Sequence, residues 1–363
     1  MTKIRVGANF LMLVKVVSIY LGSVIGAGFA TGQEIMQFFI LHGSNALKGA
    51  FVATFLFAYL GGLVMFLSVT MRSGSYKKLL NYLIGAKAGK FMDVLSLAML
   101  LGGLSVMMAG SGAVLGEQMA WSSRSGILLM ALLTSAVLLG GVEGVLAANV
   151  FIAPTKFLAL AGISIAAILA SGCPALMLVS QAPCAGGVAG HWAPASILYV
   201  SYNMVVPVAV LSSLGGTVSL KTGIAGGVIG GFLLGIAVIL MSLAGLAYLP
   251  EAASYQIPFL YLVRRLGAGF SRALGLLIWL AIFTTAIANA HGIASRLAPN
   301  GGRRYRLCGV GACLLALPLA RYGFANLVRF LYPLFGLAGL VLLISLLFKP
   351  VHIFFNKNKK YFK

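Results

Sequence analysis

The 363-residue chain is 61% hydrophobic and 9% charged, with a mean hydropathy of +1.04, which excludes an ordinary soluble globular domain. Its 26 Lys and Arg residues against 5 Asp and Glu give a net charge of +21, but no soluble basic domain is available to bind nucleic acid. The composition therefore predicts an all-α polytopic membrane protein, a single transmembrane domain over residues 1–363 with the lipid bilayer around it.

Apolar runs of about bilayer-spanning length recur along the chain. They predict about ten transmembrane helices, at residues 8–40, 47–71, 92–116, 125–142, 147–171, 194–216, 222–248, 270–292, 306–321 and 325–348. A basic tail follows at residues 349–363. No cleavage pattern follows the short basic start Met1–Arg5, so the first helix is expected to stay in the protein.

The first predicted helix is interrupted by the segment Gly22-Ser-Val-Ile-Gly-Ala-Gly28. Three glycines in seven residues weaken a helix by roughly 1 kcal/mol each relative to alanine, so the backbone can leave helical geometry there. Carbonyls that end the first half-helix would bind a cation, and amides at Gly26, Ala27 and Gly28 would bind a carboxylate. The alternative is close helix packing, because Gly22 and Gly26 have the spacing of a GxxxG motif.

Polar residues follow the break inside the same span, at Thr31, Gln33 and Glu34. An acidic residue within a membrane span is costly and usually faces a cavity or a partner. We interpret Glu34 as a candidate coupling or gating carboxylate. An equally good interpretation places it near the outer mouth, beside a basic neighbour.

Basic residues are unevenly divided between the two sides of the predicted helices. With the N-terminus in the cytoplasm, 17 Lys and Arg residues fall inside, seven fall outside, and Lys15 and Lys156 lie within spans. This bias predicts that both termini are cytoplasmic.

The second five predicted helices follow the first five at a constant offset of about 180 residues. Repeat one covers about 8–171 and repeat two about 194–348. Because five is odd, the second set enters the membrane from the opposite side, which predicts a 5+5 inverted repeat of the kind common in transporters. Ser201-Tyr-Asn203 and Pro207 lie in the sixth helix at the depth of the first break, so broken helices 1 and 6 are expected.

Cysteine and histidine residues give no sign of a metal centre or a cofactor. Cys173 and Cys184 flank an outer loop, where a disulfide remains open, and Cys308 and Cys313 are expected to be apolar filler. The four histidines share no ligand spacing; they are His42, His191, His291 and His352. No nucleophile, base and orienting group converge by spacing, so an enzyme is not expected.

The segment from Gly22 to Glu34, GSVIGAGFATGQE, and the following Gln37-Phe-Phe39 resemble the YkvI-like bacterial membrane proteins. More broadly, the chain resembles the amino acid-polyamine-organocation superfamily, whose LeuT-type fold has five plus five helices. The resemblance implies a bacterial cell-membrane protein that transports a small solute, an amino acid or a related zwitterion, by alternating access. It also implies an outer lid at Leu249–Gly267.

The resemblance also implies a sodium site, because sodium-coupled members place two hydroxyls on helix eight opposite the broken helix. Ala281-Ile-Phe-Thr284-Thr285 matches that motif. The implied ligands are the carbonyls of Gly22, Ile25 and Ala281 and the hydroxyls of Thr284 and Thr285. In the alternative interpretation, the two threonines are bonded to their own helix.

Lys156 offers a different coupling mechanism, since some sodium-independent relatives place a lysine ammonium where the ion would lie and couple to protons. The alternative is a Lys156 that snorkels to the cytoplasmic interface. The implied substrate contacts are Ser23, Met107, Met108, Ser111, Ser201, Tyr202 and Asn203, together with the break. Phe29 replaces the asparagine that amino-acid symporters carry after the glycines, which argues against a second sodium.

A non-transporting membrane receptor or assembly factor that has kept a transporter fold is a second class of function. Ligand binding without flux would favour it. Substrate identity, transport direction and oligomeric state stay open at this point.

Overall fold

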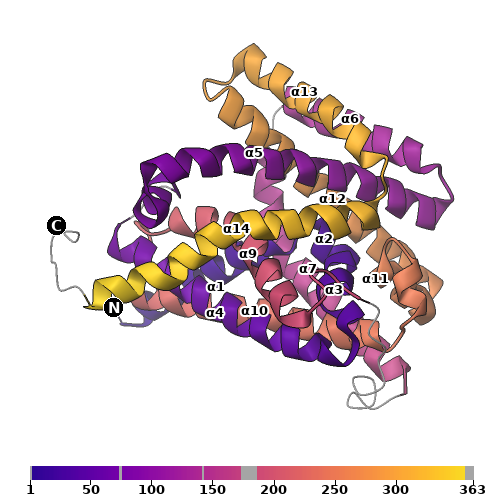
Figure 1. Cartoon of the computed structure of the whole chain (residues 1–363), viewed down its shortest axis with the longest axis horizontal. Coiled ribbons are helices and arrows are strands. Elements are labelled where there is room, and N and C mark those ends of the chain that lie inside the picture. Colours follow the sequence, from indigo (N-terminus) through magenta and orange to yellow (C-terminus); the bar gives the residue numbers. More distant parts are fainter. Residues whose placement is uncertain (1, 73–75, 141–142, 173–185, 356–363) are drawn as a thin grey trace.

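The computed structural model describes residues 2–72, 76–140, 143–172 and 186–355, which form helices joined by turns (Figure 1). The first half contains α1 (Thr2–Val24), α2 (Ala27–Thr31), α3 (Gln33–Phe38), the 3-10 helix η1 (Ile40–Asn45), α4 (Ala46–Thr70), α5 (Tyr76–Met119), α6 (Ser123–Gly140) and α7 (Glu143–Ala170). The second half contains α9 (Trp192–Ser212), α10 (Leu220–Leu246), η2 (Glu251–Ser254), α11 (Pro258–Leu266), α12 (Ala268–Leu297), α13 (Gly302–Ala320) and α14 (Phe324–Phe355).

Seven helices of the described residues are long and apolar enough to cross a membrane. They are Ile40–Thr70, Gly89–Met119, Ser123–Gly140, Trp192–Ser212, Leu220–Leu246, Gly269–Leu297 and Phe324–Phe348. Two shorter apolar helices, Phe10–Val24 and Pro154–Ala170, lie where the first and fifth spans are predicted. The basic start of α13 accounts for its lower hydropathy. The all-helical membrane fold is therefore confirmed, and the count of ten spans stays a prediction.

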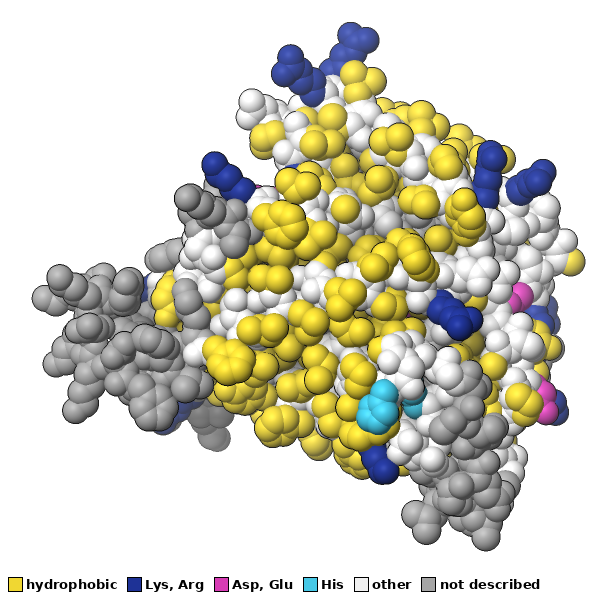
Figure 2. Space-filling view, viewed as in Figure 1, with side chains coloured by type: hydrophobic (Ala, Val, Ile, Leu, Met, Phe, Trp, Pro, Cys, Tyr) yellow, Lys and Arg dark blue, Asp and Glu magenta, His cyan; other side chains and the backbone are white. Residues whose placement is uncertain are grey.

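The surface has the distribution of side chains that a bilayer requires. Figure 2 shows hydrophobic side chains over the middle of the visible face and Lys and Arg side chains mostly towards its margins. Large apolar residues such as Phe55, Leu132 and Phe348 are about 70% exposed, which only a hydrocarbon environment makes inexpensive. In Figure 1, α1 begins and α14 ends at one end of the molecule, while α11 lies at the opposite end.

Helices at equivalent places in the two halves pack against each other. The contacting pairs are α1 with α9, α4 with α10, α5 with α12, and α6 with α13. Such contacts are expected when a pseudo-twofold axis relates the halves, because equivalent helices nearest the axis meet across it. The tightest approach joins α4 and α10, where a Cβ on Gly231 would meet the Phe57 carbonyl and one on Gly61 would lie 2.5 Å from the Gly227 carbonyl oxygen. Glycine is required there because the two backbones touch.

The predicted break in the sixth helix is wrong, since α9 is continuous from Trp192 to Ser212. Two of its polar residues, Ser201 and Asn203, donate hydrogen bonds to backbone carbonyls. Ser201 Oγ donates to the carbonyls of Leu198 (2.9 Å) and Gly336 (2.5 Å), so the helix keeps its form around a polar side chain. Pro207 lies within the helix and has no N–H for the Asn203 carbonyl four residues earlier, but it does not end the helix.

Cys173, Cys184 and the tail beyond residue 355 lie outside the described residues, so the disulfide remains open. Cys308 and Cys313 are both free, and Cys313 is buried in α13, in agreement with a packing role.

Candidate functional site

The backbone leaves helical geometry at the predicted glycine segment. α1 ends at Val24, α2 begins at Ala27, and Gly26 between them is extended, with φ −87° and ψ −168°. The Gly26 N–H donates to the Val24 carbonyl (2.7 Å), and the Gly26 carbonyl accepts from Ala30 (3.0 Å) at the start of the new helix. The sequence prediction of a broken first helix is confirmed.

A second kink follows at Gly32, which the sequence did not predict. Gly32 joins α2 to α3 in the left-handed region (φ 77°, ψ −1°), and a Cβ there would meet the Phe259 ring of α11. In a straight helix, Glu34 would lie about 9 Å further along the axis than Gly28. The kink instead folds α3 back, so that the Glu34 carboxylate contacts Gly28 where a Cβ would stand.

The Glu34 carboxylate is held by two neutral donors from α9. The Tyr202 hydroxyl donates to Glu34 Oε2 (2.5 Å), and the Asn203 amide also hydrogen bonds to the carboxylate. Tyr202 packs on Tyr332 of α14 with ring centroids 5.1 Å apart, and Tyr332 packs on Phe335 at 5.8 Å. The half-helix after the break is therefore fixed to α9 and, through the rings, to α14.

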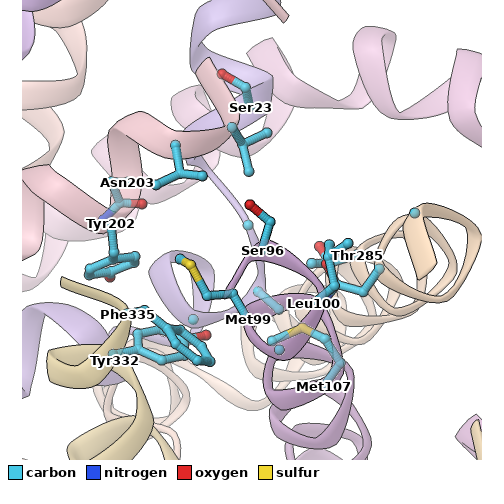
Figure 3. Close-up of a pocket in the computed structure, with 18 of the residues that line it drawn as sticks. Ser23, Ser96, Met99, Leu100, Met107, Tyr202, Asn203, Thr285, Tyr332 and Phe335 are labelled. Carbon is cyan, nitrogen blue, oxygen red and sulfur yellow. The ribbon is translucent and has the colours of Figure 1, made fainter. Parts of the chain in front are cut away.

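These residues line a cavity of about 320 Å³, within the range typical of small-molecule sites. The lining is Ser23, Gly26, Ala27, Gly28, Glu34, Ser96, Met99, Leu100, Gly103, Met107, Tyr202, Asn203, Val205, Val206, Ala209, Thr285, Asn289, Gly292, Arg296, Tyr332 and Phe335. Figure 3 shows Tyr202, Tyr332 and Phe335 on one side, Thr285 on the other, and Met99 between them. The cavity thus has an aromatic side, defined by these three rings, and a hydroxyl side at Thr285.

The cavity extends from the break towards the end of the molecule where α1 begins. The α12 residues that line the cavity run along the helix from Thr285 to Arg296, and Arg296 is exposed near the end of that helix. The opposite end is covered by the predicted lid, now seen as η2 and α11. Phe259 lies over Gly32, and the Gln256 N–H donates to Glu117 Oε1 at the end of α5 (3.0 Å).

The structure brings part of the predicted sodium-ligand set to the break. Thr285 lines the cavity, and its Oγ1 lies 3.9 Å from where a Cβ on Gly26 would stand. The hydroxyls of Thr285 (2.7 Å) and Thr284 (3.1 Å) both donate to the Ala281 carbonyl, the bonding that the alternative interpretation expects. Gly22 belongs to the last turn of α1, and Ile25 lies in the break and is fully buried. The ion itself stays a prediction.

The other predicted residues divide between the cavity and the helix packing. Ser23, Met107, Tyr202 and Asn203 line the cavity with the break residues. Ser111 does not: it donates to the Gly126 carbonyl of α6 (3.0 Å) and accepts from Trp279 Nε1 (2.9 Å).

Ser201 and Met108 are buried but do not line the cavity. Lys156 of α7 is 1% exposed, so the alternative of a residue that snorkels to the interface is wrong. Its coupling role stays a prediction. Sequence reasoning missed Tyr332 and Phe335, because nothing in their spacing on α14 distinguishes them from ordinary apolar packing.

No protein-family model matches the chain. Among solved structures, Mhp1 in its inward-facing conformation has a TM-score of 0.64, 13% identity, and coverage of 92% of this chain and 75% of that one. A manganese transporter from Eremococcus coleocola has a TM-score of 0.58 with 11% identity, covering 96% and 88%. A sodium-coupled sialic acid symporter has 0.51 with 13% identity, covering 94% and 87%. The LeuT-type fold is thereby confirmed.

Two curated relatives come from Bacillus subtilis (strain 168). The uncharacterized protein YyaD is 28% identical over 352 residues, 96% of this chain and 98% of its own. The uncharacterized membrane protein YkvI is 30% identical over 335 residues, 91% of this chain and 94% of its own. The resemblance found in the glycine segment therefore extends over the whole membrane domain, and the chain belongs to the YkvI family of bacterial membrane proteins.

Proposed function

We propose that the chain is a secondary active transporter that moves a small amino-acid-like solute by alternating access, with sodium as the coupling ion. The observation that carries the proposal is the cavity at the helix break, which is reached from one end of the molecule and covered at the other by the lid. The similarity in fold to Mhp1, a manganese transporter and a sialic acid symporter supports it.

Alternating access requires a site that is reachable from one side at a time. With the N-terminus in the cytoplasm, as the basic residues predict, the cavity in this structure opens inwards. Opening the other side would require Phe259 to leave Gly32 and the lid to leave Glu117. The closed side thus depends on contacts of one short segment, which a rocking motion of the helices can break.

The sodium part rests on the hydroxyl side of the cavity. The Ala281 carbonyl and the hydroxyls of Thr284 and Thr285 are oxygen ligands of the kind that a hard cation prefers, and Thr285 faces the broken helix. A proton-coupled mechanism at Lys156 is the second candidate. The burial of that side chain favours it, because ionisable residues buried within membrane spans commonly belong to proton or ion pathways.

Uptake into proteoliposomes tests the proposal. A panel of radiolabelled amino acids is offered under an inward sodium gradient, an inward proton gradient, or neither. We expect sodium-driven uptake that Thr285→Ala abolishes and Thr285→Ser retains, because serine keeps the hydroxyl. Proton-driven uptake that is insensitive to Thr285→Ala and lost in Lys156→Met would replace sodium by the second candidate. Binding of solutes without uptake under either gradient would contradict transport and favour a receptor.

A further inference from the structure

Glu34 is the acidic residue among those that line the cavity, and the basic one, Arg296, lies at its exposed end. The partners of Glu34 are the Tyr202 hydroxyl and the Asn203 amide, which are neutral. No ion pair between Glu34 and a basic side chain is formed within the described part of the chain. An ionised Glu34 is therefore not balanced by charge from its surroundings.

An unbalanced carboxylate at this depth is expensive. Burying a charge without a counter-charge costs several kcal/mol, and acidic residues within membrane spans pair with a cation or face one that enters. A carboxylate has about four lone-pair positions, of which two donors fill two at Glu34. The remaining positions are available to a donor that comes in with the solute.

The surroundings of Glu34 favour an organic cation over a metal ion. A divalent cation such as Ca²⁺ or Mg²⁺ takes six or more oxygen ligands, whereas this side of the cavity presents the rings of Tyr202, Tyr332 and Phe335. Groups of three or more His, Cys, Asp or Glu that could hold a metal are absent from the described residues. An ammonium group on an apolar body suits both features, because its N–H groups reach the carboxylate and aromatic faces attract its charge.

We propose that Glu34 binds the ammonium group of the transported solute, whose apolar part lies against Tyr202, Tyr332 and Phe335. This inference rests on the proposed function in taking the cavity as the substrate site. The sequence predicted that a substrate carboxylate binds at Gly28. The structure instead places the protein's own Glu34 carboxylate there, so the positively charged group of the substrate is the one expected at this position. The ammonium group is then essential, and the substrate carboxylate is dispensable.

Matched ligand sets test which charged group the site requires. Purified protein is titrated with the twenty common L-amino acids, with the amines that lack their carboxylates, and with the acids that lack their amino groups, and binding is measured as thermal stabilisation. We expect at least one amino acid and its amine to bind, and their desamino acid not to bind. Glu34→Gln keeps an acceptor for Tyr202 but removes the charge, and should weaken binding by about 30-fold or more.

Asp93→Asn is the matched control, since it removes the charge of an exposed acid outside both the cavity lining and the lid, and it should leave binding unchanged. The inference is overturned if desamino acids bind as well as amino acids, if no amine binds, or if Glu34→Gln binds amines as tightly as the native protein. Stabilisation by manganese chloride that is lost in Glu34→Gln, without amine binding, would show a metal site instead.

The same ligands separate this inference from the proposed function. Gradient-driven uptake of desamino acids would leave transport standing and remove the ammonium site. Glu34-dependent binding of amines without uptake under any gradient would support the ammonium site and contradict transport.

Discussion

Replacing Gly28 by alanine tests whether the glycine segment exists to make room for the Glu34 carboxylate. A Cβ at Gly28 would collide with Glu34 Oε1 and stand 2.8 Å from Cδ and 2.9 Å from Cγ. The same change at Gly26 is the matched control, because its backbone is extended and the nearest atoms to a Cβ are 3.9 Å away. If the glycines served only flexibility or close helix packing, alanine at Gly26 and at Gly28 would have similar effects on stability. If Gly28 makes room for Glu34, alanine at Gly28 has the larger effect.

The expected magnitude follows from the contacts that Gly28→Ala breaks. The Glu34 carboxyl must move away from Gly28 and therefore from Tyr202. The hydrogen bond that the Tyr202 hydroxyl donates to the carboxylate is then lost, and a hydrogen bond to a charged group contributes about 1.5–3 kcal/mol. The better helix propensity of alanine returns about 1 kcal/mol. We therefore expect Gly28→Ala to lower the free energy of unfolding by about 0.5–2 kcal/mol and Gly26→Ala to leave it nearly unchanged.

Thermal unfolding of the purified variants measures the difference, and a double-mutant cycle isolates its cause. Glu34→Ala removes the atoms that collide, so Gly28→Ala should cost far less in that background. Amine binding should be weakened in Gly28→Ala, because the Glu34 carboxylate is displaced. Equal stability of the two single variants would refute the reasoning, as would additive effects in the cycle.

Three further substitutions test the packing of the helices. Gly231→Ala should destabilise the protein by about 1–3 kcal/mol, because its Cβ meets the Phe57 carbonyl of α4. Gly311→Ala is the control: the space around Gly311 is open, so alanine should stabilise the protein by up to about 1 kcal/mol. Similar melting temperatures for the two variants would contradict this view of the α4–α10 contact. Ser201→Ala should cost about 1 kcal/mol through the lost bond to the Gly336 carbonyl but leave ligand affinity unchanged, and a changed affinity in titrations would return Ser201 to the binding site.

Much of the fold was predictable because hydrophobicity and charge act over whole helices. Apolar length located the spans to within a few residues, as at α4, which runs from Ala46 to Thr70 against a prediction of 47–71. The break was predictable because three glycines are a local signal that needs no tertiary partner. α1 and α2 accordingly end and begin within that segment.

What failed depended on contacts between distant residues. Ser201 was predicted to face the substrate, but its hydroxyl reaches the Gly336 carbonyl, 135 residues away. Ser111 is likewise occupied by Gly126 and Trp279, which no spacing rule connects to it. A polar residue in a membrane helix marks a buried hydrogen bond, and the sequence does not say whether the partner is a ligand or another helix.

The two kinks in the first span have different roles, and the position of Glu34 depends on the second kink and not on the lid. The break at Gly26 frees backbone groups, whereas Gly32 redirects the chain so that Glu34 returns to Gly28. The left-handed conformation of Gly32 is a local property of the backbone, which glycine adopts at little cost. We therefore expect Glu34 to stay folded back when Phe259 lifts from Gly32. Both sides of the membrane would then offer the solute the same carboxylate, as a site reached alternately from either side requires.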